Sequence, residues 1–206
     1  MTSKTRDKSP TRIRVGITGH RPNRMPERHW PRIRQDLATI MADIEARNPG
    51  RKPVLLSGLA EGADRLAAFV ALGRSWTVHA VLPFHRTRFE EDFPDPAARG
   101  EFRALLAAAA KIEEPGRAAH VSRPPEEAYD AVGQKLLAGG DILIAIWDGQ
   151  RSRGRGGTVE VIEQARARGI PVVWISARKP APPRHLQQGE EIAAAASANR
   201  AKTGAE

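Results

Sequence analysis

The chain has 206 residues, enough for one ordinary domain with tails and a core of its own. Hydrophobic residues make up 40% and charged residues 28%, which excludes a collagen, a coiled coil and a wholly disordered polymer. The absence of cysteine excludes a disulfide framework, a cysteine-based zinc site and a cysteine nucleophile. No run approaches the roughly 20 apolar residues that span a bilayer, and residues 1–10 lack the apolar core of a secretory signal. We therefore expect a cytoplasmic protein with no membrane partner.

The net charge of +9 is concentrated near the two ends of the chain. Residues 1–14 carry +4 and residues 178–206 carry +2, which leaves +3 for the 163 residues from 15 to 177. A basic tail binds polyanions through salt-sensitive contacts, although solvated termini explain the same charges. Aromatic residues make up 5% of the chain, and this low content argues against a base-stacking platform.

Strand and helix signals alternate along the chain. A strand at 13–18 and a helix at 33–44 are followed by a buried strand at 53–58 and a helix at 66–72. A third strand at 76–83 leads into residues 84–96, whose charge and proline content predict a long loop able to cover a site. A helix at 99–110, a weak strand at 118–121 and a helix at 125–137 come next. The continuously apolar strand at 141–147, a helix at 158–168 and a strand at 170–176 complete the pattern.

This alternation predicts the α/β class and a single doubly wound Rossmann-like domain with a mainly parallel sheet of five to six strands. We expect the domain at 12–177, a flexible basic tail at 1–11, and a mostly disordered Pro/Ala-rich tail at 178–206 that permits a helix at 189–201. Ligands of such sheets bind where the strands end, close to the point where the strand order reverses. Loops that directly follow strands are therefore the candidate sites.

Two such loops carry glycine beside polar groups. The first offers a hydroxyl, an imidazole and a guanidinium near a glycine that lets an anion approach the backbone, and it consists of Thr18, Gly19, His20 and Arg21. The second joins a buried strand to a helix and suits a phosphate or ribose; its candidates are Ser57, Gly58, Glu61, Gly62 and Asp64. Ordinary strand-to-helix turns, with Asp64 as a first-turn helix acid, explain the same residues.

The third loop is the most specific. Its candidate ligand-binding residues are Asp148, Gly149, Arg155, Gly156, Gly157 and Thr158, with Arg151 and Arg153 nearby. Adjacent glycines at a helix start expose N–H donors, arginines favour phosphate, and Asp148 is placed to accept a hydrogen bond from a sugar hydroxyl. A simpler interpretation makes Thr158 an N-cap and Glu160 a first-turn acid. The six histidines show no ligand spacing, so neither a metal nor another cofactor is predicted.

These motifs resemble those of the SLOG superfamily, the Rossmann-like fold shared by the DNA-processing protein A family and the Lonely Guy, or lysine-decarboxylase-like, family. The run from Ser57 to Asp64 is similar to the Ser-Gly-x-Ala-x-Gly-x-Asp signature of the DNA-processing proteins. Gly156, Gly157 and Thr158 resemble the glycine-rich helix start of the Lonely Guy proteins. The resemblance covers roughly residues 13–177 and implies the same fold, with a homodimer as a further expectation.

Function transfers less directly from this resemblance. Lonely Guy enzymes hydrolyse nucleoside monophosphates and place a catalytic carboxylate three residues after the threonine, where this chain has Val161. Glu160 and Glu163 are the nearest carboxylates to that position, and the arginine that the family uses on the preceding helix is absent. The DNA-processing proteins usually carry added helical domains for which this chain has no room. Other SLOG branches are thought to sense nucleotide-derived signals beside effector proteins.

Three functions therefore remain open. The first is binding or sensing of a nucleotide or nucleotide-derived ligand, without catalysis, with an effector protein as a partner. The second is a nucleotide N-glycosidase in which Glu160 or Glu163 is catalytic. The third is binding of single-stranded nucleic acid through Arg151, Arg153, Arg155 and the basic N-terminal residues.

Overall fold

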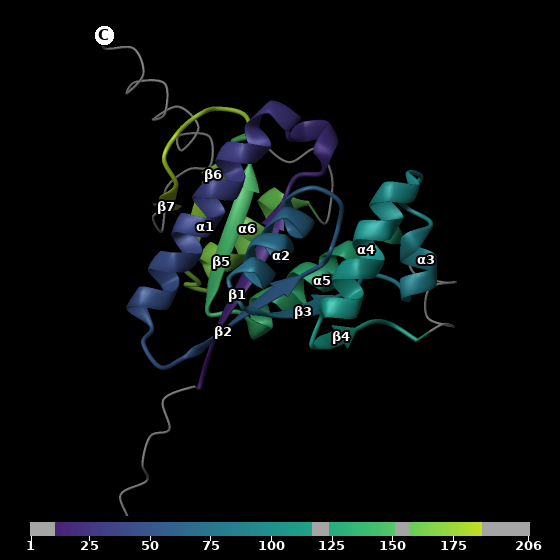
Figure 1. Ribbon diagram of the computed structural model, residues 1–206, viewed down its shortest axis with the longest axis horizontal. Helices are drawn as coiled ribbons and strands as arrows, with labels where there is room; N and C mark the ends of the chain where they lie inside the picture. Colours follow the sequence, from purple (N-terminus) through teal and green to yellow (C-terminus); the bar gives the residue numbers. More distant parts are fainter. Residues whose placement is uncertain (1–10, 117–123, 151–156, 187–206) are drawn as a thin grey trace, which may run out of the picture.

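The computed structural model describes residues 11–116, 124–150 and 157–186, which form an α/β domain built on one sheet (Figure 1). Its strands are β1 (Arg12–Gly19), β2 (Lys52–Ser57), β3 (Thr77–Val81), β4 (Lys111–Glu113), β5 (Ile142–Trp147), β6 (Val172–Ser176) and β7 (Arg184–Leu186). They lie in the order β4-β3-β2-β1-β5-β6-β7, and every neighbouring pair is parallel except β6 and β7. The predicted α/β class and the mainly parallel Rossmann-like sheet are confirmed.

Helices cover both faces of the sheet (Figure 1). The α-helices are α1 (Trp30–Arg47), α2 (Ala63–Gly73), α3 (Arg86–Glu90), α4 (Pro96–Ala108), α5 (Pro125–Gly139) and α6 (Thr158–Ala167), and the short 3-10 turns are η1 (Pro22–Arg24) and η2 (Glu27–His29). Alternate residues of β1, Ile13, Val15 and Ile17, pack in one apolar cluster with α1 and α2. On the other face, α6 packs on β5 and β6, while α5 packs on β2.

The sheet has seven strands in the described part of the chain, where the sequence predicts five to six. β7 lies in the segment expected to be a disordered tail; it pairs Leu186 with Val172, and the buried Leu186 packs with Trp174. The sheet thus includes residues beyond 177. A three-residue edge strand has no periodicity to detect, and its contacts form only once β6 is in place. Residues 1–10 of the predicted tail at 1–11, the strand at 118–121 and the helix at 189–201 lie outside the described residues.

Residues 84–96 do not form the predicted long loop. They contain α3 and the start of α4, and Phe84, Phe89 and Phe93 are buried. Phe89 packs edge-on against Phe93, with ring centroids 5.0 Å apart, and against Phe102 of α4 at 5.5 Å. Aromatic packing accounts for the order of this segment despite its many charges.

None of the helices in the described ranges is both long and apolar enough to cross a membrane.

Candidate ligand-binding site

A cavity of about 450 Å³ opens at the carboxyl edge of the sheet, beside the central strand β1. From β1 the strand order runs through β2 and β3 on one side and through β5 and β6 on the other, so the order reverses between β1 and β5. Open α/β sheets bind ligands at this kind of position. The lining residues are Ile17, Thr18, Gly19, His20, Arg21, Asn23, Arg24, Ala60, Asp64, Tyr129, Val132, Gly133, Leu136, Gly157, Thr158, Val159 and Val161.

The loop after β1 is hydrogen-bonded to both β5 and α2. The His20 backbone N–H donates to the Ile146 carbonyl at 3.1 Å, and the His20 carbonyl accepts from the Ala63 N–H at 3.1 Å. A Cβ on Gly19 would lie 2.4 Å from the Ala63 Cβ, and one on Gly62, whose φ is +98°, would lie 2.6 Å from the His20 oxygen. Both positions therefore require glycine, which fixes the path of the chain toward Arg21 and Arg24.

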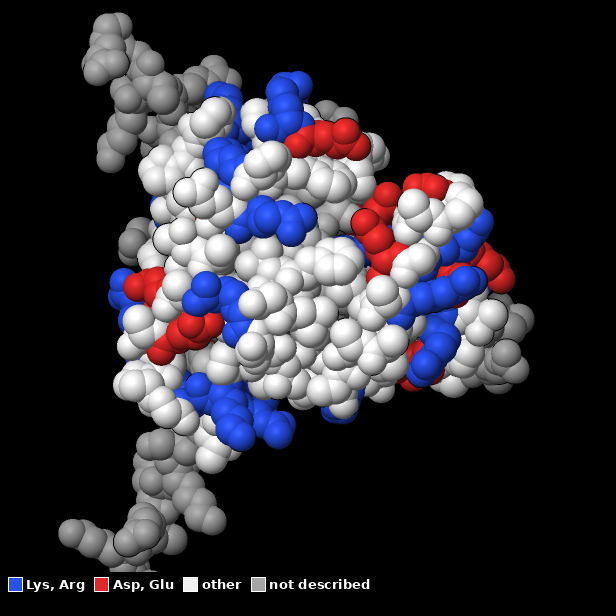
Figure 2. Space-filling view, in the orientation of Figure 1, with Lys and Arg blue, Asp and Glu red and all other residues white. Residues whose placement is uncertain are grey.

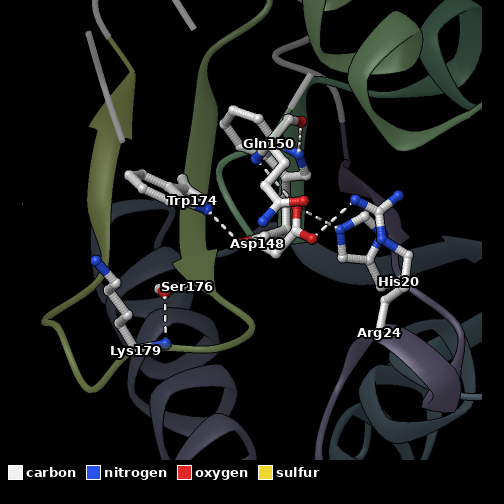
Figure 3. A network of polar contacts seen from close by, with 8 residues as sticks. His20, Arg24, Asp148, Gln150, Trp174, Ser176 and Lys179 are labelled. Carbon is white, nitrogen blue, oxygen red and sulfur yellow. Dashed lines mark hydrogen bonds and ion pairs between the residues drawn. The ribbon is translucent and has the colours of Figure 1, made fainter. Parts of the chain in front are cut away.

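A buried carboxylate at the end of β5 holds two side chains of this loop (Figure 3). The Asp148 side chain is 2% exposed; its Oδ1 lies 2.9 Å from the His20 Nε2, and its Oδ2 accepts from the Arg24 Nη2 at 2.8 Å. The Gln150 backbone N–H also donates to Oδ1, at 3.1 Å. Burial alone raises the pKa of Asp148, but His20, the Gln150 amide and Arg24 outweigh it and hold the pKa below its ordinary value.

Of the two side chains that contact Asp148, His20 is the uncharged one. Burial lowers the pKa of His20, and the contact with Asp148 only partly offsets the effect, so the imidazole is neutral near pH 7. The Asp148 carboxylate and the Arg24 guanidinium thus form the charged pair, with His20 packed beside them. Asp148 is not among the cavity-lining residues, although the sequence favoured it as a partner for a sugar hydroxyl. It acts instead on the side chains that do line the cavity.

The second predicted loop contributes less to the cavity than the sequence suggested. Ala60 and Asp64 line the cavity, whereas Ser57, Gly58, Glu61 and Gly62 do not. The buried Ser57 hydroxyl accepts from the Leu59 N–H at 3.1 Å and donates to the Asp64 carbonyl at 3.4 Å. Both hydrogen bonds therefore lie within the segment that joins β2 to α2. Asp64 is a buried carboxyl whose pKa is raised to about 7, chiefly by burial.

The start of α6 supplies the third part of the site. Gly157, at the N-cap position, and Thr158 line the cavity. The first N–H groups of an α-helix have no hydrogen-bond partner within the helix. Gly149 is buried with a φ of +80°, which suits glycine, but it does not line the cavity. Arg155 and Gly156, together with Arg151 and Arg153, lie outside the described residues.

The two carboxylates considered for catalysis are not in the lining of the cavity. Glu163 is exposed, and neither it nor Glu160 belongs to the lining residues. Val161 does line the cavity, at the position where the Lonely Guy pattern has its carboxylate. In the described part of the chain, the ionisable groups of the lining are His20, Arg21, Arg24, Asp64 and Tyr129.

One wall of the cavity is apolar and comes from α5 and α6. It consists of Val132, Gly133 and Leu136 facing Val161. A Cβ on Gly133 would lie 2.8 Å from the Val161 Cγ2, so glycine here lets the two helices approach closely. The sequence did not predict this wall because apolar residues at helical spacing look like core, and it did not predict Arg24 because no motif marks it.

Neither a protein-family model nor a curated protein matches the sequence. Among solved structures, DNA processing protein A from Streptococcus pneumoniae aligns with a TM-score of 0.56 and 16% identity, over 95% of this chain and 58% of that one. DNA processing protein A from Helicobacter pylori, described for its single-stranded DNA binding mode, aligns with a TM-score of 0.53 and 18% identity, over 93% of this chain and 74% of that one. The chain thus spans little more than half the length of the Streptococcus protein.

These alignments establish the fold. The chain has the Rossmann-like fold of the DNA processing proteins, as the motif resemblance implied.

Proposed function

We propose that the cavity beside β1 binds a nucleotide or a nucleotide-derived ligand that carries a phosphate. The observation that carries the proposal is one cavity lined by arginines, by a helix start and by an apolar wall. Arg21, Arg24 and the N–H groups of the α6 start suit a phosphate, and Val132, Leu136 and Val161 suit the flat apolar face of a base. A volume of about 450 Å³ lies within the range of small-molecule sites.

The charge of the lining supports an anionic ligand. Arg24 is neutralised by Asp148, and Asp64 has a pKa of about 7, so this carboxyl is about half protonated near neutral pH. Arg21 has no carboxylate partner within the described ranges, and its side chain is exposed at the cavity. The lining therefore keeps a positive charge that a phosphate would neutralise.

Binding without turnover is the form of the proposal that the site supports best. N-glycosidase chemistry needs a carboxylate close to the anomeric carbon. Glu160 and Glu163 do not line the cavity, and Asp148 is covered by His20 and Arg24. Asp64 is the one carboxyl of the described lining; it is buried, and its Oδ2 accepts from the Ala60 N–H at 3.4 Å. We propose with it a sensing role, in which the bound ligand signals to an effector protein.

The test is thermal unfolding of the protein with AMP, ATP, NAD, ADP-ribose and cyclic nucleotides, with chromatography of each mixture for released base. A ligand at about 100 times its Kd adds roughly 2.7 kcal/mol to the free energy of unfolding. Gly157→Asp places a carboxylate at the α6 N-cap, where Asp stabilises helices, so it should abolish the ligand's effect without destabilising the protein. Gly157→Asn is the matched neutral control and should retain the effect.

Three results would contradict the proposal. No stabilisation by any nucleotide would remove it, and equal losses in Gly157→Asp and Gly157→Asn would show that charge at the α6 start is irrelevant. Base release by the wild-type protein that disappears in Glu160→Gln or Glu163→Gln would replace binding with N-glycosidase activity.

A second candidate function, binding of single-stranded nucleic acid, is favoured by a basic surface at the opposite end of the sheet. Lys and Arg side chains gather where β1 and β2 begin (Figure 2). Arg12, Arg14 and Lys52 are exposed there, and the register pairs Arg12 with Lys52. The pKa of His79, on β3, is lowered by burial and by the charges of Lys111, Arg12 and Arg14.

Fluorescence anisotropy of a labelled oligothymidylate at several salt concentrations tests this second candidate. Removing a side chain that neutralises one phosphate should lower the slope of log K against log salt by about 0.7. The Arg12→Ala and Arg14→Ala double variant should reduce the slope, whereas Arg47→Ala, which removes an exposed arginine paired with Asp43, should not. A slope that does not change in the double variant would rule out this surface.

A further inference from the structure

We propose that Tyr129 and Asp92 are positioning residues that hold Arg21 as the anchor for the ligand's phosphate, an inference that rests on the proposed nucleotide binding. Arg21 follows β1 in a loop, where nothing in the backbone fixes a long side chain. Its Nη2 donates to the Tyr129 hydroxyl at 2.7 Å, and its guanidinium lies 5.6 Å from the centre of the Tyr129 ring. Both side chains line the cavity.

The hydrogen bonds of Tyr129 have a defined direction. The Tyr129 hydroxyl donates its single proton to the Asp92 Oδ2 at 3.0 Å, so its oxygen is left to accept from Arg21. The pKa of Tyr129 is raised to about 12, chiefly by burial, which keeps this proton in place at neutral pH. The Asp92 Oδ1 in turn accepts from the Arg88 Nη1 at 2.6 Å. A chain of three hydrogen bonds thus runs from α3 through α5 to the loop after β1.

Aromatic packing supports this chain of three hydrogen bonds. The Tyr129 ring meets the Phe84 ring edge-on, with centroids 5.9 Å apart, and the Phe89 ring at 6.4 Å. The Arg88 guanidinium lies 5.2 Å from the centre of the Phe84 ring. The segment that the sequence suggested as a loop over the site is therefore a packed support for the cavity wall, and it acts on the site through the Tyr129 hydroxyl.

These contacts make Tyr129 a partner of Arg21 rather than a stacking platform for a base. The Arg21 guanidinium lies 5.6 Å from the ring centre, and the Phe84 ring packs nearly perpendicular to the Tyr129 ring at 5.9 Å. An arginine has five N–H donors, and the hydrogen bond from Arg21 to Tyr129 uses one of them. The remaining donors belong to a side chain that is already held in place. Binding of a phosphate therefore costs less side-chain conformational entropy than it would with a mobile arginine.

A double-mutant cycle with AMP and adenosine as probes, measured by isothermal titration calorimetry, tests the assignment. Tyr129→Phe keeps the ring and removes only the hydroxyl, and we expect it to weaken AMP binding about tenfold, or about 1.4 kcal/mol, and to leave adenosine binding unchanged. Arg21→Ala should weaken AMP binding at least as much. In the Arg21→Ala background, Tyr129→Phe should have no further effect, because its effect passes through Arg21.

Asp92→Asn is the second variant, and we expect it to weaken AMP binding in the same selective way. Glu91→Gln is its matched control, since Glu91 is exposed, lies next to Asp92 and also contacts Arg88, at 3.9 Å. Equal losses of AMP and adenosine binding in Tyr129→Phe, or a full loss on top of Arg21→Ala, would overturn the positioning role while leaving nucleotide binding intact. If the wild-type protein binds neither probe, the proposed binding of this nucleotide fails, and the positioning role fails with it.

Discussion

Asp64 shows how one buried carboxyl sets a pH dependence. Its pKa is raised from 3.8 to about 7, chiefly by burial, against the opposing effects of the Ala60 amide and of Arg21 and Arg65. The folded protein therefore holds this proton more tightly than the unfolded chain does. The stability that the protonated carboxyl contributes is complete below about pH 4 and is lost as the pH rises toward 7.

Asp64→Asn should remove this loss of stability. One pKa unit corresponds to about 1.4 kcal/mol, so relative to wild type the variant should gain about 3 kcal/mol between pH 5 and pH 8. Urea unfolding of both proteins at the two pH values measures the gain. Asp43→Asn, which removes an exposed carboxylate paired with Arg47, serves as control and should show almost none. A gain for Asp64→Asn that does not change with pH would mean that this carboxyl titrates normally.

At the scale of elements, one buried arginine joins α2 to its neighbours. Arg65 is 2% exposed; its Nε donates to the Leu59 carbonyl at 3.1 Å, and its Nη1 donates to the Ala98 carbonyl at 2.6 Å. Its guanidinium lies 4.1 Å from the centre of the Phe93 ring. Leu59 has a φ of +54°, which is unusual for leucine, and the hydrogen bond from Arg65 helps to hold that turn. The same side chain fixes α4, and with it the support behind Tyr129.

Arg65→Met keeps much of the buried volume and removes the donor to the Leu59 carbonyl, whereas the Ala98 carbonyl lies inside α4, where the helix backbone supplies a second donor. We expect a loss of about 1–3 kcal/mol in the free energy of unfolding, because the Leu59 carbonyl becomes a buried unsatisfied acceptor. Urea unfolding measures the loss. Arg103→Met, at an exposed arginine of α4 that pairs with Glu90, should stay within about 0.5 kcal/mol of wild type. Similar losses in the two variants would contradict a special role for Arg65.

At the scale of the whole molecule, β5 joins the two layers of helices into one unit. The apolar clusters on the two faces share this strand, since Ile144 and Ile146 pack with α1 and α2 while Leu143 and Ala145 pack with α6. We therefore expect a single unfolding transition in urea. Trp30 and Trp76 pack in the first cluster and Trp147 and Trp174 in the second, so tryptophan fluorescence reports on both faces. Its midpoint should coincide with that of far-UV circular dichroism, and two separate midpoints would show that the faces unfold independently.

Much of the fold was predictable because its signals are local. The central strands are continuous apolar runs, as at 142–147, and the helices repeat apolar residues every three or four positions, as Ile33, Leu37, Ile40 and Ile44 do on α1. Alternating strands and helices predict a parallel sheet. In such a sheet the loops that follow the strands all lie at the same edge. The failures have the same origin, because β7 and the aromatic segment at 84–96 are ordered by contacts with distant residues.

The sequence by itself determined the α/β class and pointed to the carboxyl edge of the sheet as the candidate site, and all three loops that it singled out contribute residues to the cavity there. Only the tertiary structure decided which side chains line the cavity. In the folded protein the Ser57 hydroxyl accepts a hydrogen bond from within its own loop, and Asp148 binds Arg24 from outside the cavity lining. Val132 and Leu136 form part of the cavity wall. The contacts responsible join residues far apart in the chain: Arg21 and Tyr129 are separated by 108 positions, and Arg24 and Asp148 by 124. Periodicity and spacing act over a few residues, whereas the direction of a side chain depends on neighbours that only folding brings together.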